Sequence, residues 1–61
     1  MKLTTDDARA AARDCNKIWV EHGNGREYTE AIENTRYLVA SNKEMTEQEK
    51  RDFLWTFEHS R

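Results

Sequence analysis

The sequence predicts an all-α fold, in which three short helices form a single small domain over residues 1–61. Three observations lead to this prediction. Apolar residues recur at helical spacing in three segments. The chain contains no proline, which would interrupt a helix. Glycines or capping residues separate the three segments, as is typical of helix ends. The first two helices should form an antiparallel hairpin, with the third packed across it.

The first helix is expected from about Thr5 to His22. Thr4 or Thr5 is the expected N-cap, because Asp6 and Asp7 then lie in the first turn, where carboxylates interact favourably with the helix dipole. Thr4 and Asp7 also match a weakened capping box, with Asp in place of Glu or Gln. The inward face of this helix comprises Ala8, Ala11, Ala12, Cys15, Ile18, Trp19 and His22.

A Gly-Asn-Gly segment at positions 23–25 separates the first two helices. Gly23 suits the left-handed position that ends a helix, and the pair Asn24-Gly25 also tolerates positive φ. The second helix is expected over Glu27–Ala40. We predict that it organises the domain, with the other two helices as its packing partners. Its unbroken apolar stripe comprises Tyr28, Ala31, Ile32, Thr35, Leu38 and Val39.

The second connection is expected over Ser41–Met45, with Asn42 as the helix stop. Thr46 and Glu49 then form a regular capping box, which predicts a third helix from about Glu47 to His59. The apolar face of this helix is tighter than the other two. It comprises Phe53, Leu54 and Phe57, with the aliphatic stem of Lys50 beside them.

Size and composition exclude several classes of protein. Charged residues make up 36% of the chain and the mean hydropathy is −1.11, so we expect a polar surface. No apolar run reaches the roughly 18 residues that a membrane span needs. The N-terminal residues do not match a secretory signal, and the lone Cys15 cannot form an internal disulfide. We therefore expect a cytoplasmic protein, and a net charge of −2 argues against a dedicated nucleic-acid binder.

Trp55 is the main anomaly of the pattern, because it points away from the apolar face of its helix. Arg51 and Glu58 share its side, and tryptophan and arginine are over-represented in binding hot spots. Trp55 is therefore either an anchor for a partner or second copy, or a residue covered by another segment of this chain. Tyr37 and Val20 lie on the polar sides of their helices and are weaker candidates, since single exposed apolar residues are common.

Two charged stripes have both a functional and a structural interpretation. Arg9, Arg13 and Lys17 lie at four-residue spacing on the first helix and suit phosphate or an acidic partner. A solvated face is the simpler interpretation, because acidic neighbours are close and Lys17 can pair with a glutamate one turn on. The acidic neighbours are Asp6, Asp14 and Glu21. Glu27, Glu30 and Glu33 form an acidic edge on the second helix, solvated or paired with the basic stripe.

Metal binding and catalysis find little support in the sequence. Cys15, His22 and His59 are the soft ligands, and Cys15 and His22 lie about 10.5 Å apart along a helix, too far to share an ion. A zinc site would need a second chain. The sequence contains no phosphate-binding glycine loop and no nucleophile elbow. We therefore expect no enzyme activity, no cofactor and no small-molecule substrate.

The sequence thus predicts a non-enzymatic protein-binding module, such as an adaptor, inhibitor or regulatory accessory protein. Its expected partner is another protein or a second copy, in a dimer or hetero-complex. Such short helical chains are common among accessory genes of phages and mobile elements. The alternative is a DNA-binding regulator of the helix-turn-helix type, whose third helix would read DNA. That helix turns Gln48, Arg51, Trp55 and His59 outward, but also carries Glu47, Glu49, Asp52 and Glu58, which phosphates would repel.

Overall fold

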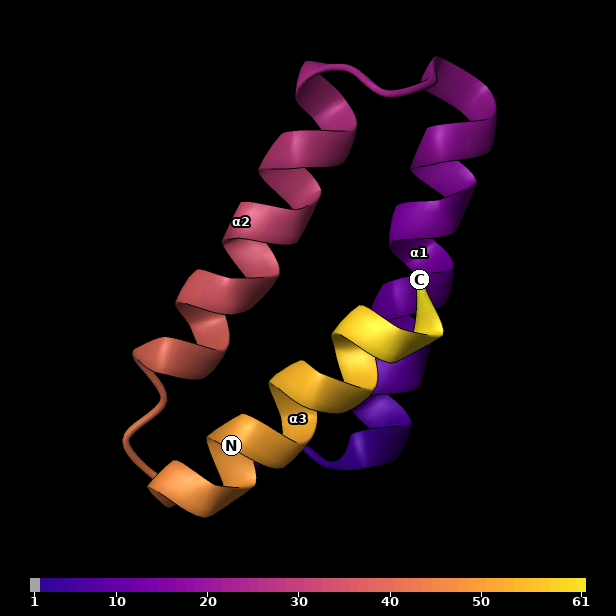
Figure 1. Ribbon diagram of the computed structural model, residues 1–61. Helices are drawn as coiled ribbons and strands as arrows, with labels where there is room; N and C mark the ends of the chain where they lie inside the picture. The colour runs from indigo at the N-terminus through magenta and orange to yellow at the C-terminus, as the bar shows by residue number, and fades with distance from the viewer. Residues whose placement is uncertain (1) are drawn as a thin grey trace.

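The computed structural model of the protein describes residues 2–61 and contains three helices in that range. Helix α1 spans Thr5–His22, α2 spans Arg26–Ala40 and α3 spans Glu47–Ser60. Helices α1 and α2 form an antiparallel hairpin, and α3 crosses its open end (Figure 1). The all-α fold and the arrangement of the three helices are therefore confirmed.

Both capping boxes fix the starts of their helices. The Thr4 hydroxyl accepts the Asp7 N–H at 3.2 Å, and the Asp7 carboxylate accepts the Thr4 N–H at 2.8 Å. Thr46 and Glu49 form the same reciprocal pair, at 3.1 and 2.9 Å. These bonds satisfy backbone donors that the first turn of a helix leaves without partners. Asp in place of Glu is therefore sufficient for the box of α1.

Gly23 ends α1 and begins the reversal into α2. Its φ of 76° lies in the left-handed region, and no other described residue has a positive φ. The Gly23 N–H donates to the Trp19 carbonyl at 2.7 Å, which satisfies one of the last carbonyls of the helix. Asn24 and Gly25 do not use the positive φ that their sequence permits, because one left-handed residue is enough to turn the chain.

The core lies at the end of the hairpin away from this loop. Small residues on α1 let the aromatic rings of α3 approach closely, because Ala8 and Ala12 are completely buried against the face that carries Phe53 and Phe57. The buried set comprises Ala8, Ala12, Cys15, Val39, Met45, Phe53 and Phe57. The interface between α1 and α3 is therefore the main contact of the domain.

The prediction that the second helix organises the domain is wrong. Helix α2 contributes one fully buried residue, Val39, and Leu38 from the predicted stripe is 62% exposed. Helix α3 lies against α1 more than against α2, so α2 is rotated about its own axis to meet the pair. Its buried side is centred near Ile32 and Val39, about 50° from the predicted centre at Thr35 by helix geometry. This rotation turns Leu38 to solvent.

The loop end of α1 is also less buried than its pattern predicts. Trp19 is exposed over nearly half its surface and packs edge-on against Tyr28, with ring centroids 5.0 Å apart. His22, predicted on the inner face, is exposed beside Glu21. The chain ends next to the middle of α1, so α3 does not extend over this end of the hairpin (Figure 1). The apolar stripe of α1 is thus longer than the helix available to cover it.

The connection between α2 and α3 contributes a residue to the core, although the sequence predicted only a loop there. Met45 is buried, although it belongs to no helix. The Asn42 side chain accepts the Glu44 and Met45 N–H groups at 2.8 and 3.2 Å, and this turn directs Met45 inward. Lys50 closes the other side of the turn, because its ammonium group donates to the Ala40 carbonyl at 2.9 Å. Met45 therefore closes the core at the end of the hairpin away from the Gly23 loop.

Candidate functional site

The outward face of α3 carries the most exposed aromatic ring on this helix. Phe53 and Phe57 hold the inward face in the core, and Trp55 lies between them in sequence, so helix geometry turns it outward. The Trp55 side chain is 64% exposed. The end of the chain does not cover it, because Arg61 reaches the opposite side of α3 and contacts Tyr28. The helical-wheel prediction for Trp55 is therefore confirmed.

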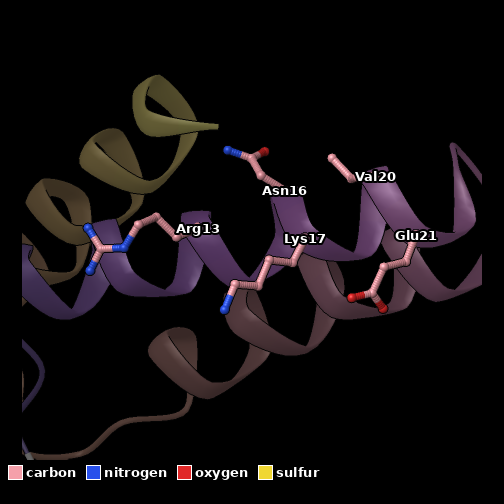
Figure 2. A pocket seen from close by; sticks show the side chains of 5 residues that line it. All are labelled: Arg13, Asn16, Lys17, Val20 and Glu21. Atoms are coloured by element: carbon pink, nitrogen blue, oxygen red, sulfur yellow. The ribbon is translucent and has the colours of Figure 1, made fainter.

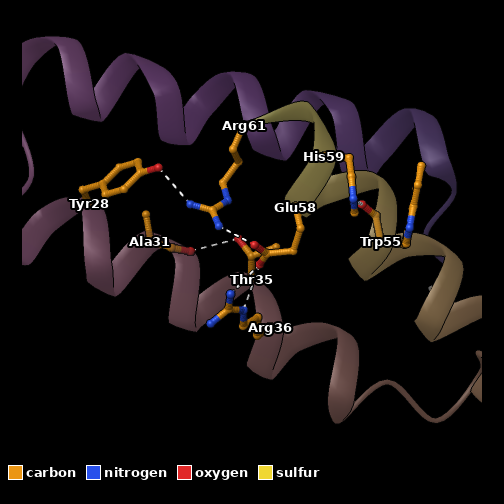
Figure 3. Close-up of polar contacts among 8 residues, drawn as sticks. All are labelled: Tyr28, Ala31, Thr35, Arg36, Trp55, Glu58, His59 and Arg61. Atoms are coloured by element: carbon orange, nitrogen blue, oxygen red, sulfur yellow. Dashed lines mark hydrogen bonds and ion pairs between the residues drawn. The ribbon is translucent and has the colours of Figure 1, made fainter.

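His59 holds the Trp55 ring from one side. The two rings are stacked, with centroids 4.0 Å apart and an angle of 16° between their planes (Figure 3). The His59 Nδ1 atom lies 2.8 Å from the Trp55 carbonyl oxygen. A carbonyl can only accept, so Nδ1 carries the proton, and Nε2 is left facing away as an acceptor in the neutral ring. The stacking and this hydrogen bond thus hold both rings in one orientation before any partner binds.

This stack could have been predicted from the sequence, because residues four positions apart, such as Trp55 and His59, meet on one helix face. From the sequence, His59 was predicted only as an outward side chain and a soft metal ligand. Arg51 lies one turn before Trp55, is exposed and forms no ion pair with any residue among 2–61. The surface that can meet a partner therefore comprises Arg51, Trp55 and His59, which we call the Trp55 surface.

Glu58, which was predicted on the same side as Trp55, and Tyr37, the weaker candidate, both lie elsewhere. Glu58 faces α2 and is bound by arginines on two sides (Figure 3). Tyr37 is 70% exposed but belongs to α2, on the side away from the buried Val39. Each helix turns its polar side away from the shared core, so Tyr37 and Trp55 mark two different surfaces. The sequence could not show this, because it does not place α2 against α3.

A polar cluster joins α2 to α3 where apolar contacts are few. Arg36 donates to Glu58 through Nε at 3.2 Å, and Arg61 also donates to the Glu58 carboxylate. Arg61 donates to the Tyr28 hydroxyl at 2.8 Å, and its guanidinium lies over the rings of Tyr28 and Phe57. On α2, the Thr35 hydroxyl returns to the Ala31 carbonyl at 2.9 Å, as its position in a packed stripe predicts. This cluster anchors α2 to the rest of the domain.

The cluster also changes the ionisation of its carboxylate. Partial burial of Glu58 opposes its ionisation, but hydrogen bonds from Arg36 and Arg61 outweigh burial, so the pKa of Glu58 lies below its ordinary value. A carboxylate whose pKa is lower in the folded state stabilises the fold above its unfolded pKa. That contribution is lost as the pH falls through the lower, folded-state value.

We expect Glu58→Gln to lower the free energy of unfolding at pH 7 by about 1–2 kcal/mol, a value reduced for the exposure of Arg36. The difference between variant and native protein should shrink as the pH falls below the ordinary glutamate pKa of about 4.3, where Glu58 in the unfolded chain becomes protonated, and it should be smallest below the lower pKa of the folded state. Urea unfolding at a series of pH values measures both effects. Glu47→Gln is the control, because Glu47 is almost fully exposed and 3.9 Å from Lys50. Equal losses in both variants would contradict an anchoring role.

The basic stripe of α1 is not uniform. Asp6 binds Arg9 at 2.9 Å, whereas Arg13 and Lys17 form no ion pair with the described residues. The predicted pair of Lys17 with Glu21 is absent from residues 2–61, where Glu21 instead lies 3.8 Å from His22. A shallow hollow of about 370 Å³ lies along this face, lined by α1 alone (Figure 2). Its lining residues are Arg13, Asn16, Lys17, Val20 and Glu21.

The acidic edge of α2 does not neutralise this stripe. Glu27, Glu30 and Glu33 are exposed and form no ion pair within residues 2–61. Pairing between the two edges, one of the two interpretations of the acidic edge, is therefore wrong within a single chain. The reason is geometric, because each stripe lies on the exposed side of its own helix, away from the buried residues.

Cys15 is a core residue between α1 and α3. Its side chain is buried, and burial raises the pKa of the thiol above its ordinary value, although the nearby Arg61 charge acts in the opposite direction. Among the described residues, no three His, Cys, Asp or Glu side chains come together as a metal site would need. Cys15 therefore acts as a small apolar side chain in this structure.

Comparison with protein-family models, with curated proteins and with solved structures finds no match to this chain. Over residues 2–61, no helix combines the length and apolar character needed to cross a membrane.

Proposed function

We propose that this domain is a non-enzymatic protein-binding module that recognises a partner through the Trp55 surface. The observation that supports this is the exposed Trp55 indole, which stacks on the His59 ring with 4.0 Å between the ring centroids. A large aromatic surface fixed before binding loses little conformational entropy when a partner covers it. Arg51, one turn away and without an ion pair among the described residues, can supply a charged contact beside the ring.

The outward face of α3 favours a protein partner over DNA. Asp52 lies on the same side as Trp55 and accepts a hydrogen bond from Gln48 at 3.0 Å. A carboxylate therefore lies in the middle of the face that a helix-turn-helix protein would place against DNA. Phosphates would meet that charge and those of Glu47 and Glu49 near the start of the helix. A carboxylate at the edge of a protein interface, by contrast, is ordinary.

The test is capture of binding proteins by immobilised domain and by its Trp55→Ala variant. We expect Trp55→Ala to weaken capture by about 30-fold or more, corresponding to about 2 kcal/mol for a hot-spot residue. Far-UV circular dichroism should show unchanged helical content, because the ring is outside the core. The readout is the set of proteins that the native domain retains and the variant releases, identified by mass spectrometry.

Leu38→Ala is the matched control, because Leu38 is as exposed as Trp55 but lies on α2. It should retain the captured proteins. Equal loss in both variants would indicate non-specific apolar adsorption, and no loss with Trp55→Ala would refute the Trp55 surface as the binding site. Loss of helical content in Trp55→Ala would show instead that the ring supports the fold.

A further inference from the structure

Two outer faces of the hairpin carry unused charges of opposite sign. On α1, Arg13 and Lys17 form no ion pair with the described residues, and on α2 the same holds for Glu30 and Glu33. Each pair lies within a helical turn, so its charges act on one side of the helix. These two faces lie outside the Trp55 surface, which belongs to α3.

Each charged face also exposes an apolar residue that the core does not use. Val20 is 82% exposed on α1, and it lines the shallow hollow together with Arg13 and Lys17 (Figure 2). Tyr37 is similarly exposed on α2, one turn after Glu33. A surface with apolar residues beside unpaired charges suits a partner that offers the opposite charges around its own apolar residue.

The spacing of the two faces matches in register. On α1, Lys17 follows Arg13 by four residues and Val20 follows Lys17 by three. On α2, Glu33 follows Glu30 by three residues and Tyr37 follows Glu33 by four. If the helices lie side by side in the same direction, each pair is offset by no more than one residue, about 1.5 Å. The opposed pairs are Arg13 with Glu30, Lys17 with Glu33, and Val20 with Tyr37.

We propose that α1 of one copy of this chain binds α2 of a second copy through these three pairs. In the opposite direction the charges still meet, but Val20 then faces Arg26 or Glu27, so the parallel direction is the one that also buries apolar surface. Both faces point away from the core of their own molecule. One copy can therefore bind two neighbours, which makes the interface heterologous and the assembly able to grow.

This interface is small and depends on exposed charges, so it forms at high protein concentration and weakens with salt. Light scattering across a range of concentrations tests it. In roughly 20 mM NaCl the average mass should rise with concentration above the 7.3 kDa of one chain, and in roughly 500 mM NaCl, where charges are screened, it should return to that value. A mass of one chain at every concentration in low salt would overturn the proposal.

Two charge-reversal variants test the faces separately. Arg13→Glu with Lys17→Glu removes the α1 face, and Glu30→Lys with Glu33→Lys removes the α2 face. Each variant alone should remain a monomer. Their mixture pairs the native α2 face of the first variant with the native α1 face of the second, and it also pairs the two reversed faces, so it should associate as the native protein does. A mixture that stays monomeric while the native protein associates would refute this pairing.

Matched controls separate position from net charge. Lys43→Glu changes the net charge as Lys17→Glu does, but Lys43 lies in the second connection, so only Lys17→Glu should reduce self-association. Adding Tyr37→Ala to the Arg13→Glu, Lys17→Glu chain should weaken association in the mixture without altering its charge. Trp55→Ala should associate as the native protein does. Self-association abolished by Trp55→Ala would assign it to α3 and overturn the proposal, whereas the Trp55 surface itself would stand.

Discussion

Phe57→Ala should destabilise the domain by about 3–5 kcal/mol, the cost of removing a buried aromatic ring and leaving a cavity. Phe57 is fully buried where α1, α2 and α3 meet, and the Arg61 guanidinium packs over its ring. A domain of 61 residues has a total stability of roughly 3–9 kcal/mol, so this variant should be largely unfolded at 37 °C. Thermal unfolding followed by circular dichroism measures the loss.

Trp55→Ala serves as the control for Phe57→Ala. It removes a larger ring from the same helix two residues away, but that ring is mostly exposed, and the cost should stay within about 0.5 kcal/mol. If the two variants lost similar stability, the arrangement of α3, with Phe57 inward and Trp55 outward, would be incorrect.

Met45→Ala should cost about 2–4 kcal/mol, although Met45 lies in a connection and not in a helix. Its side chain is 6% exposed and belongs to the same buried cluster as Val39 and Phe53. Most substitutions in a surface loop cost far less, because loop side chains are rarely packed. Urea unfolding at equilibrium measures this difference in free energy.

Met45→Leu is the companion variant. A side chain of similar volume should retain most of the packing, with a loss below about 1.5 kcal/mol. Lys43→Ala, two residues away and exposed, should cost still less. A small effect of Met45→Ala would mean that the turn held by Asn42 does not direct this side chain into the core.

Local signals in the sequence predicted the elements of the fold well. The capping boxes at Thr4 and Thr46 and the left-handed Gly23 each depend on residues within one turn of the chain. Such interactions are independent of how helices pack, so a linear sequence contains them completely. The helix bounds in the structure differ from the predicted ones by one residue, at the start of α2 and at the end of α3.

The arrangement of the three helices was predicted, but the buried side of α2 and the individual contacts between helices were not. The apolar stripe of α2 gives its period, but the side that becomes buried is decided by where α3 lies, and this exposes Leu38. Likewise, the binding of Glu58 by Arg36 links residues from two helices. Sequence could place Trp55 outward because that inference needs one helix only, and its stacking on His59 needed only the spacing of four.

The buried thiol of Cys15 gives the domain an internal reporter of its own opening. A thiol reagent needs both access and the thiolate form, and burial between α1 and α3 limits both. Labelling of native protein should therefore proceed only during excursions in which α3 separates from α1. When reclosing is faster than labelling, the ratio of the rate in native protein to the rate in denatured chain gives the population of the open state. One natural residue can thus follow the main interface without an added probe.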